Sequence, residues 1–486
     1  MKKYNIMLIM ADQLTPYMMS CYGNREVISP HLEQLAQQSI CYENAYTSNP
    51  LCTPARASLM TGKYTSSMHC YDNASAFSCE EPTLAHYLTN AGYETVLSGK
   101  MHFIGADQLH GFSRRLTTDV YPSGFCWLPH YVDEEKHILQ SEAWGNAIHY
   151  NAKTAHPQEW NEGLLFDEET HMRAREYLYT EGKNTKEPFF LCVSYHHPHD
   201  PFQPPYKYWN LYEGADITLP DIESTRLEGD TTLDKWLNTG FHRTDVFPVK
   251  GKENLYAVRR AYSALVTYID DKVGELIRDL KETGLYENTI IIFTSDHGDM
   301  LGERGMVQKR CFYEWSSRIP LLIHYPDNRN ERVGGPVSIV DLAPTIVDLA
   351  GEGAMEEAEG ISLAGKKPEE GRPVFCESHG EAILWPCYMV RRGEFKYTYI
   401  HQKETQLFCL KDDPGEKDNL SGRPEYAKLE KELKGLILER FHPEEVLHYM
   451  DTAIRKKKIV KQAMERTKTA WDYMPVVDES KRFSRK

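Results

Sequence analysis

Short apolar runs alternate with amphipathic helical patterns along the first three quarters of the chain. Several of these runs are apolar on both faces, which is typical of strands that helices cover on both sides. Apolar residues recur at three- and four-residue spacing over residues 262–280, and Gly284 is a suitable helix stop. Another helix is predicted over 341–349. The predicted strands are residues 5–11, 40–46, 95–98, 189–195, 289–294 and 320–325.

This alternation predicts an α/β fold with a large, mainly parallel sheet sandwiched by helices. After Gly351 a polar, glycine-rich loop leads to short strand-like runs, including a hairpin that turns near Gly393. They predict a smaller C-terminal antiparallel α+β domain and an extended tail. The weakly periodic stretch 120–185 is predicted to form long loops over a site. The predicted divisions are a main domain (1–365), a small antiparallel domain (366–450) and a basic tail (451–486).

Composition and charge limit the classes of protein to which the chain could belong. The chain has 486 residues, 41% of them hydrophobic, and a formal net charge of −15. This apolar content supports one large core or two domains, and the negative charge argues against a nucleic-acid binder. Residues 451–486 carry the opposite sign, with a net charge of +6. They form either a solvated helix face or a segment that docks on an acidic body, its own or a neighbour's.

The cysteines and the N-terminal residues predict the cellular compartment of the protein. The 11 cysteines include no Cys-x-x-Cys pair, which predicts a reducing environment and mostly buried thiols. The apolar part of the N-terminus is short and runs into Asp12, so we expect no secretory signal. No stretch of about 18 uninterrupted apolar residues predicts a membrane span. We expect a cytoplasmic protein with no membrane and no nucleic acid among its partners.

Polar side chains follow four of the predicted strands, at the sheet edge where open α/β folds bind ligands. Each alone has an ordinary explanation, such as a helix cap or a structural histidine, but four together favour a site. Asp12, Gln13, Asp296 and His297 offer oxygens and one imidazole, which suit a hard divalent cation. Ca²⁺ is the leading candidate, with Mg²⁺ and Mn²⁺ as alternatives.

A second set of side chains can supply positive charge and hydrogen-bond donors. A cation beside such a cluster is what a tetrahedral oxyanion requires, and it would locally reverse the negative field of the whole chain. The sequence therefore predicts a small anionic substrate. The residues of this set are Arg56, Lys100, His102, His199 and Lys309.

The most specific motif is Cys52-Thr-Pro54-Ala-Arg56, followed by Thr61-Gly62. With it the chain resembles the type I sulfatases of the alkaline-phosphatase superfamily, whose signature is Cys-x-Pro-x-Arg with Thr-Gly behind it. The strand-end residues occur in the matching order, so the resemblance covers nearly the whole chain. The alternative for Cys52 is an inert buried thiol.

The resemblance is closer to choline sulfatases than to arylsulfatases. Gln13 and His297 stand where arylsulfatases have an acid and an asparagine, and phosphonate monoester hydrolases share both features. The chain departs from the choline-sulfatase pattern between Trp144 and about Gly163. The segments that match it are 71–74, 97–103, 107–112, 117–122 and 471–473.

The resemblance implies that a maturation enzyme oxidises Cys52 to formylglycine, whose hydrate is the nucleophile and a metal ligand. An unmodified thiolate could attack sulfur too, but it has no second hydroxyl with which to expel sulfate. Arg56 is expected to hold the formylglycine through its fork of donors.

The same resemblance assigns roles to the basic residues. Lys100, His199 and Lys309 are expected to stabilise charge on the sulfuryl oxygens. His199 is the favoured general acid and Lys309 its competitor, while His102 is the base that lets sulfate depart.

Choline-O-sulfate is the leading substrate that the resemblance implies. A quaternary ammonium has no donor protons, so it needs aromatic faces and a carboxylate. The predicted substrate-binding residues are Asn73, Trp127, Trp471 and Asp472, and a tail supplied by a second subunit would make the enzyme an obligate dimer or tetramer. The alternatives are a phosphonate monoester or phosphodiester hydrolase, a sulfatase for a carbohydrate or aryl ester, and a non-catalytic binding protein on the same fold.

Overall fold

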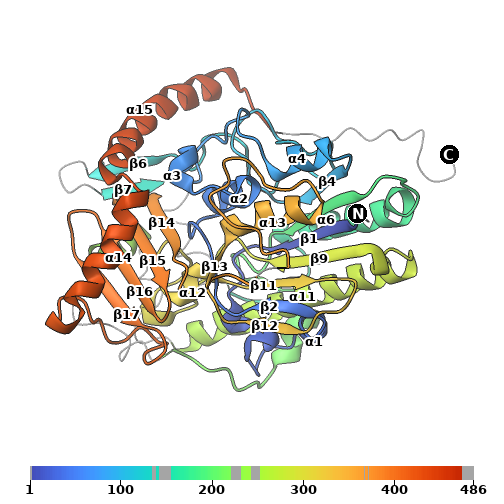
Figure 1. The fold of residues 1–486 in the computed structure, drawn as a ribbon, viewed down its shortest axis with the longest axis horizontal. Coiled ribbons are helices and arrows are strands. Elements are labelled where there is room, and N and C mark those ends of the chain that lie inside the picture. The colour runs from blue at the N-terminus through green and yellow to red at the C-terminus, as the bar shows by residue number, and fades with distance from the viewer. Residues whose placement is uncertain are drawn as a thin grey trace.

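A computed structural model describes residues 3–133, 138–141, 155–220, 231–241, 252–365, 367–369 and 371–472. Its centre is an eight-stranded sheet. The strands are β1 (Asn5–Ala11), β2 (Ser39–Tyr42), β4 (Glu94–Gly99), β5 (Arg114–Arg115), β8 (Phe189–Tyr195), β9 (Thr289–Thr294), β11 (Leu321–His324) and β12 (Glu331–Val333). Their order across the sheet is β12-β2-β11-β9-β1-β8-β4-β5 (Figure 1).

Most strand pairs of this sheet are parallel. β1 pairs in parallel with β8 and β9, and β4 pairs in parallel with β8. β11 runs antiparallel to both β9 and β2, so the sheet is mixed. The predicted strand 40–46 is two strands, β2 in the large sheet and β3 (Ala45–Tyr46) in a three-stranded sheet with β10 (Arg318–Ile319) and β13 (Val337–Ser338).

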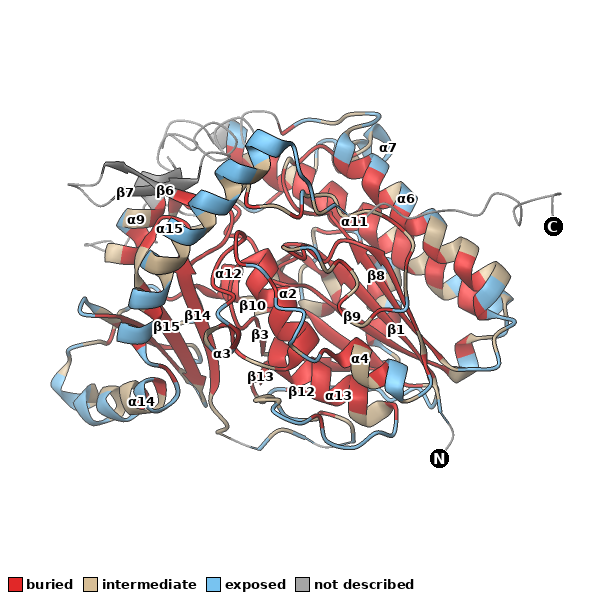
Figure 2. Ribbon diagram, turned by 90° about the horizontal axis from the view of Figure 1, so that it is seen from above, coloured by how far each residue is buried: buried red, intermediate tan, exposed pale blue. Residues whose placement is uncertain are grey.

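Helices cover both faces of the large sheet. Along β1, Met7, Ile9 and Ala11 face one core and Ile6 and Leu8 face the other, as the two-residue period of a strand requires. The first core includes α1 (Pro30–Ala36), α6 (Glu162–Tyr177) and α11 (Lys252–Glu282), and the second α2 (Cys52–Thr61), α4 (Leu84–Asn90) and α13 (Leu342–Leu349). Figure 2 shows α2 and the central strands in the colour of buried residues.

The C-terminal part is a separate antiparallel sheet, as predicted. It consists of β14 (Val374–Gly380), β15 (Ile383–Arg392), β16 (Phe395–Ile400) and β17 (Thr405–Cys409) in that order, and the β15–β16 hairpin turns at Gly393. Leu433 and Ile437 of α14 (Ala427–Arg440) are buried in the second core with this sheet. The predicted fold class is therefore confirmed.

The predicted boundary at 451 falls inside a helix, and the division into domains stays a prediction. α15 (Pro443–Thr467) starts beside the small sheet and crosses to the main domain, largely exposed (Figures 1 and 2). In the part of the chain that the structure describes, no helix combines the length and apolar character needed to cross a membrane.

The remaining elements are short or peripheral. They are α3 (Thr65–Met68), β6 (Pro129–Asp133), β7 (Ile138–Ser141), α7 (Tyr206–Trp209), α9 (Thr232–Phe241) and α12 (Glu314–Ser317).

Candidate active site

Four neighbouring strands bring the predicted polar residues to one edge of the sheet. β9, β1, β8 and β4 lie side by side and parallel, so their carboxyl ends meet. Asp12 and Gln13 follow β1, Lys100 follows β4, His199 lies on the loop after β8, and Asp296 comes after β9. All five are buried. Topology alone thus gathers residues that are far apart in the sequence.

Helix α2 carries Cys52 to the same edge as its first residue. The Sγ atom lies 3.2 Å from Nε2 of His297 and 3.9 Å from both Oδ1 of Asp12 and Nζ of Lys100. Burial, with the nearby charge of Asp12, raises the pKa of the Cys52 thiol to about 11. An unmodified side chain is therefore a neutral thiol near pH 7 and a poor nucleophile.

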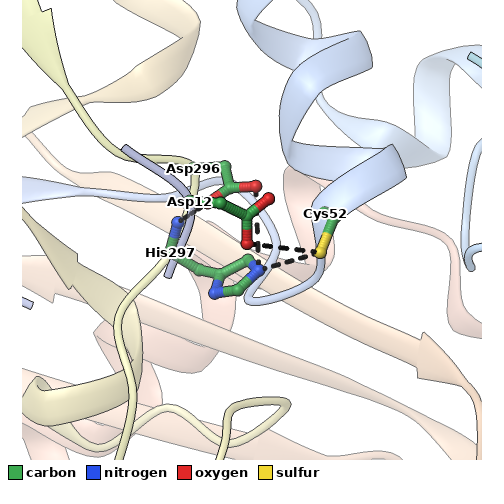
Figure 3. Close-up of side chains that lie close together, drawn as sticks. All are labelled: Asp12, Cys52, Asp296 and His297. Atoms are coloured by element: carbon green, nitrogen blue, oxygen red, sulfur yellow. Dashed lines mark hydrogen bonds and ion pairs between the residues drawn. The ribbon is translucent and has the colours of Figure 1, made fainter. Parts of the chain in front are cut away.

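Four side chains converge as a metal ion requires. One ligand atom each of Asp12, Cys52, Asp296 and His297 lies within 4.8 Å of the others, and Figure 3 shows the side chains gathered around one point. Nδ1 of His297 lies 3.0 Å from the carbonyl oxygen of Gly298, which can only accept, so Nδ1 carries the proton. Nε2 therefore keeps a lone pair beside Cys52. These donors fit a hard divalent cation.

Arg56 donates hydrogen bonds to the two carboxylates of this group. Its Nη2 donates to Oδ2 of Asp12 at 2.8 Å and its Nε to Oδ2 of Asp296 at 2.9 Å. Its Nη1 donates to the carbonyl oxygen of Lys100 at 2.6 Å and to Oγ of Ser194 at 2.8 Å. We expected Arg56 to hold residue 52. Its planar fork of donors matches the geometry of these carboxylates, and a contact with formylglycine at position 52 stays a prediction.

Charge near Cys52 is balanced by close ion pairs. Nζ of Lys100 lies 2.6 Å from Oδ2 of Asp12. Burial alone would raise the pKa of the Asp12 carboxyl, but the positive charges around it, with Lys100 first, hold that pKa well below its usual range. Burial lowers the pKa of Lys100, and the charge of Asp12 more than reverses this. An ammonium group therefore persists beside the nucleophile position.

Two acids that the sequence analysis did not single out orient Gln13. Its Nε2 donates to Oδ1 of Asp200 at 3.2 Å and to Oδ2 of Asp299, while its Oε1 accepts from Nζ of Lys309. Because carboxylates take the amide protons, the oxygen is the atom that faces Lys309. Burial, reinforced by the charge of Asp200, raises the pKa of Asp299 to about 6.

Lys309 and His199 form a close pair. Nδ1 of His199 lies 2.6 Å from the carbonyl oxygen of Asp200 and therefore carries the ring proton. Its Nε2, 2.9 Å from Nζ of Lys309, accepts from that ammonium. Burial and the Lys309 charge hold the pKa of His199 well below its usual value. His199 is therefore a neutral imidazole whose Nε2 faces Lys309.

His102 is a neutral imidazole with open nitrogens. Burial and the charge of Lys100 lower the pKa of His102 to about 3. Both ring nitrogens are buried, and neither has a hydrogen-bond partner among the residues that the structure describes. The carbonyl of His102 accepts from Oγ1 of Thr53, the neighbour of Cys52, at 3.1 Å. Buried polar atoms without a hydrogen-bond partner can form hydrogen bonds with a ligand.

Of the predicted substrate-binding residues, Asn73 lies nearest to Cys52. Its Oδ1 accepts from the backbone N of Thr53 at 3.0 Å, at the start of α2. The Trp127 ring stands edge-on to Tyr121 at 5.5 Å, and Tyr121 in turn lies beside Lys100.

The described end of the tail lies on the chain's own surface. Trp471 packs edge-on against Phe125 at 5.5 Å. Oδ1 of Asp472 accepts from N and Oγ of Ser123 at 2.9 and 3.1 Å. Both contacts are made with residues of the same chain, and the exchange of tails between subunits stays a prediction. The predicted departure at Trp144 lies outside the described residues.

The sequence analysis gave no role to Asp119, Tyr121, Asp200 or Asp299. Asp200 directly follows His199, and Asp299 lies two residues after His297, so their position was an available signal. Asp119 and Tyr121 lie in segment 117–122, whose match to choline sulfatases carried no information about side-chain contacts.

A family model described as Sulfatase matches residues 4–352. The chain belongs to the sulfatase family. A second family model, the C-terminal part of N-sulphoglucosamine sulphohydrolase, matches residues 302–442 of this sulfatase. The chain is therefore an enzyme that hydrolyses sulfuric esters.

One curated relative and two solved structures are also similar to this sulfatase. The sulfatase is 36% identical to a choline-sulfatase of Rhizobium meliloti (strain 1021), over 99% of this chain and 96% of the relative. It resembles the structure of a protein in complex with its substrate D-glucosamine-2-N,6-O-disulfate, with a TM-score of 0.70, 26% identity, and coverage of 90% and 97% of the two chains. A phosphonate monoester hydrolase of Agrobacterium radiobacter shares the fold, with a TM-score of 0.71, 23% identity, and coverage of 90% and 95%.

Proposed function

We propose that this sulfatase hydrolyses choline-O-sulfate to choline and sulfate, using formylglycine derived from Cys52 and a bound divalent cation. The convergence of Asp12, Cys52, Asp296 and His297 at the start of α2 is the observation that carries this proposal. The 36% identity to a choline-sulfatase over almost the whole chain supports the choice of leaving group.

The cation would be held by Asp12, Gln13, Asp296 and His297 together with the side chain at position 52. When bound, it supplies the Lewis acidity that activates an oxygen nucleophile and offsets charge on the sulfuryl group. Calcium is favoured because most of these donors are oxygens, and Mn²⁺ and Mg²⁺ are the alternatives. Conversion of Cys52 to formylglycine makes a maturation enzyme a necessary partner.

The chain's own cations stabilise the sulfate. The ammonium of Lys100, 3.9 Å from Sγ of Cys52, lies where charge develops on the sulfuryl oxygens. Arg56 donates to both Asp12 and Asp296 and fixes these carboxylates in place, so it acts through the carboxylates and not on the substrate. Preorganised charges of this kind need no rearrangement during the reaction.

Protonation of the leaving alkoxide is assigned to the Lys309–His199 pair. Nζ of Lys309 lies 2.9 Å from Nε2 of His199. This contact supports a role in which Lys309 supplies the proton, directly or through His199. The buried ring nitrogens of His102 have no partner among the described residues, which supports its proposed role as the base that accepts a proton as sulfate departs.

The leaving-group side offers aromatic surface. Tyr121 and Trp127 are half-buried neighbours that a quaternary ammonium could contact through their π faces. A second candidate function is hydrolysis of a phosphonate monoester or phosphodiester, which Gln13 and His297 favour. A carbohydrate or aryl sulfate is a third possibility for the same catalytic groups. The enzyme is proposed to be a cytoplasmic homo-oligomer.

A substrate panel combined with mass spectrometry tests the proposal. The peptide that contains Cys52 should show conversion of the thiol to the aldehyde in protein co-produced with a maturation enzyme. That protein should hydrolyse choline sulfate faster than 4-nitrophenyl sulfate, glucosamine 6-sulfate or phenyl phosphonate monoesters, and Cys52→Ala should hydrolyse none. A preference for the phosphonate would replace the proposed substrate class, and full activity with an unmodified thiol would remove the proposed nucleophile.

A further inference from the structure

One buried carboxylate, Asp119, collects hydrogen bonds from two segments that both border the active site. Its Oδ2 accepts from the backbone N of Met101 at 2.9 Å, from that of His102 at 2.8 Å, and from Nη2 of Arg115 at 2.8 Å. Its side chain is only 6% exposed. Burial would raise the pKa of Asp119, but Arg115 and the other donors lower it, so the carboxylate stays ionised.

These bonds hold the segment that carries Lys100 and His102. His102 has a φ of 55°, in the left-handed region that residues with a Cβ rarely adopt. Two consecutive N–H groups on one carboxylate oxygen hold the backbone in this conformation. The same segment is held from the opposite side, because the carbonyl of Lys100 accepts from Arg56 and that of His102 from Thr53.

The other oxygen of Asp119 holds the segment that carries Tyr121. Oδ1 accepts from the backbone N of Val120 at 2.9 Å and from that of Tyr121 at 3.4 Å. The Tyr121 ring centre lies 4.5 Å from Nζ of Lys100 and 5.0 Å from the His102 ring. The ring is half-buried, so one part faces the catalytic cations and another faces outward.

The Tyr121 ring also reaches the other side of the site. It stands 6.1 Å from the ring of His199 and 5.5 Å from that of Trp127. Burial raises the pKa of the Tyr121 hydroxyl well above its usual value, with the charge of Asp200 next in importance, so the phenol is not an acid or base near pH 7. The ring lies between the two sides of the site and can offer the substrate its aromatic face.

We propose that Asp119 is a positioning residue that sets the Lys100–His102 segment and Tyr121 in register with each other, and that Tyr121 contacts the substrate. This inference rests on the proposed function. A sulfate ester has an anionic head and an organic leaving group. With the head on Lys100, the leaving group meets the Tyr121 ring, which already lies against that ammonium. A single carboxylate thus fixes the distance between the cation and the aromatic face.

Asp119→Asn tests the positioning role, because its amide nitrogen cannot accept and one of the two segments must lose its acceptor. A displacement of about 1 Å at a catalytic group lowers kcat on the order of 100-fold, and the weaker contact with the sulfate head raises KM on the order of tenfold. Asp107→Asn is the matched control. Oδ1 of Asp107 accepts from the backbone N of Leu109 and His110 at 2.9 and 3.1 Å in a nearby loop. This control should lower thermal stability but leave kcat unchanged.

If Asp119→Asn and Asp107→Asn both retain wild-type kcat per folded molecule, Asp119 is merely structural and the positioning proposal is overturned. Thermal unfolding and circular dichroism establish the folded fraction of each variant.

Two variants of Tyr121 test substrate contact. Tyr121→Phe keeps the ring and should retain kcat/KM within about threefold, whereas Tyr121→Ala removes it and should raise KM on the order of tenfold. Equal loss in both variants would place the function in the hydroxyl. No loss in Tyr121→Ala would mean that the ring does not touch the substrate. Either result contradicts the assignment.

Binding of inorganic sulfate, measured by calorimetry, separates this inference from the proposed substrate. Asp119→Asn should weaken sulfate binding on the order of tenfold and Asp107→Asn should not, whichever ester the enzyme hydrolyses. Weakened binding in an enzyme inactive on choline sulfate would refute the substrate and keep the positioning role. Unchanged sulfate binding together with unchanged turnover of any ester would overturn the positioning role alone.

Discussion

Two groups of side chains border Cys52, and the fold holds them in different ways. The strand-end cluster consists of Asp12, Arg56, Lys100, Asp296 and His297. The aromatic wall consists of Tyr121, Phe125, Trp127 and Trp471. The first group has no exposed surface, whereas the second includes half-buried rings.

The strand-end cluster is fixed by the sheet itself. Asp12, Lys100 and Asp296 follow strands of one continuous hydrogen-bonded sheet, and Arg56 reaches both acids from a fully buried helix. Moving any one of them would leave a buried charge without a partner, which costs several kcal/mol. This part of the site is therefore rigid.

The aromatic wall is fixed by loops and by the C-terminal helix. Ile454 of α15 and Trp471 pack on a small cluster that includes Phe125 and Trp127. Nζ of Lys457 lies 3.5 Å from Oδ1 of Asp72, beside the loop that carries Asn73. Such elements can change without disturbing the sheet. The sheet therefore positions the catalytic groups, and we expect the loops and the tail to select the leaving group.

The largest effect should follow from removing the nucleophile. Cys52→Ala should lower kcat by roughly 10⁴-fold or more, because the other groups position a sulfate but cannot form the bond. Thermal stability should change little. Cys192→Ala, a buried cysteine in the middle of β8, is the control and should lower stability without affecting turnover. Substantial turnover by Cys52→Ala would exclude residue 52 as the nucleophile.

The next largest effect should follow from removing one acid of the strand-end cluster. Asp296→Ala should lose bound metal and lower kcat on the order of 10³-fold, and it should destabilise the fold by about 3 kcal/mol because Arg56 loses a buried partner. Elemental analysis and thermal unfolding measure these effects. Asp341→Ala breaks another buried pair, in which Arg372 lies 2.7 Å away, and should affect stability only. Full metal content in Asp296→Ala would contradict the ligand assignment.

A smaller effect should follow from removing the proton donor, and it should depend on the leaving group. Lys309→Met should lower kcat for an alkyl sulfate by roughly 10²- to 10³-fold, since an alkoxide leaves poorly without a proton. A nitrophenyl sulfate, whose leaving group needs little protonation, should lose much less. Steady-state kinetics with both esters measures the ratio. An equal loss on both would mean that Lys309 stabilises charge and does not deliver the proton.

The same contrast between regions explains how far the sequence could be interpreted. The strands at 5–11, 189–195 and 289–294 coincide with β1, β8 and β9, because buried strands form continuous apolar runs. The site residues at the strand ends could be predicted because open α/β sheets bind ligands at the carboxyl ends of their strands. The strand predicted at 40–46 is divided between two sheets, a tertiary choice that its apolar pattern does not encode.

The residues that the sequence analysis did not identify make contacts between loops. Asp119 acts on backbone N–H groups 17 and 18 positions away, and any residue can supply such a group, so no sequence pattern marks the contact. The orientation of Gln13 depends on Asp200 and Asp299, which reach it from two other strand ends. The docking of Trp471 on Phe125 joins segments far apart in the chain.

The smallest and most specific effect should come from the tail. Deleting residues 469–486 removes the Trp471–Phe125 contact at 5.5 Å and the carboxylate of Asp472, which accepts from the backbone N of Ser123 at 2.9 Å. The strand-end cluster is untouched, so kcat should stay within about threefold. KM for choline sulfate should rise by about tenfold, since an ammonium group depends on nearby aromatic and carboxylate groups. A small aryl sulfate should be affected much less.

Subunit mixing then decides whether the tail serves its own chain or a partner. The truncated chain is mixed with full-length Cys52→Ala, which has an intact tail but no nucleophile. The contacts of Trp471 and Asp472 with their own chain predict that KM stays high in the mixture, because each tail then serves the active site of its own chain. Recovery of the wild-type KM in mixed oligomers, monitored by sedimentation velocity, would show that tails are exchanged between subunits. An equal rise in KM for choline and aryl esters would instead mean that the tail supports the aromatic wall as a whole and has no specific role toward the ammonium group.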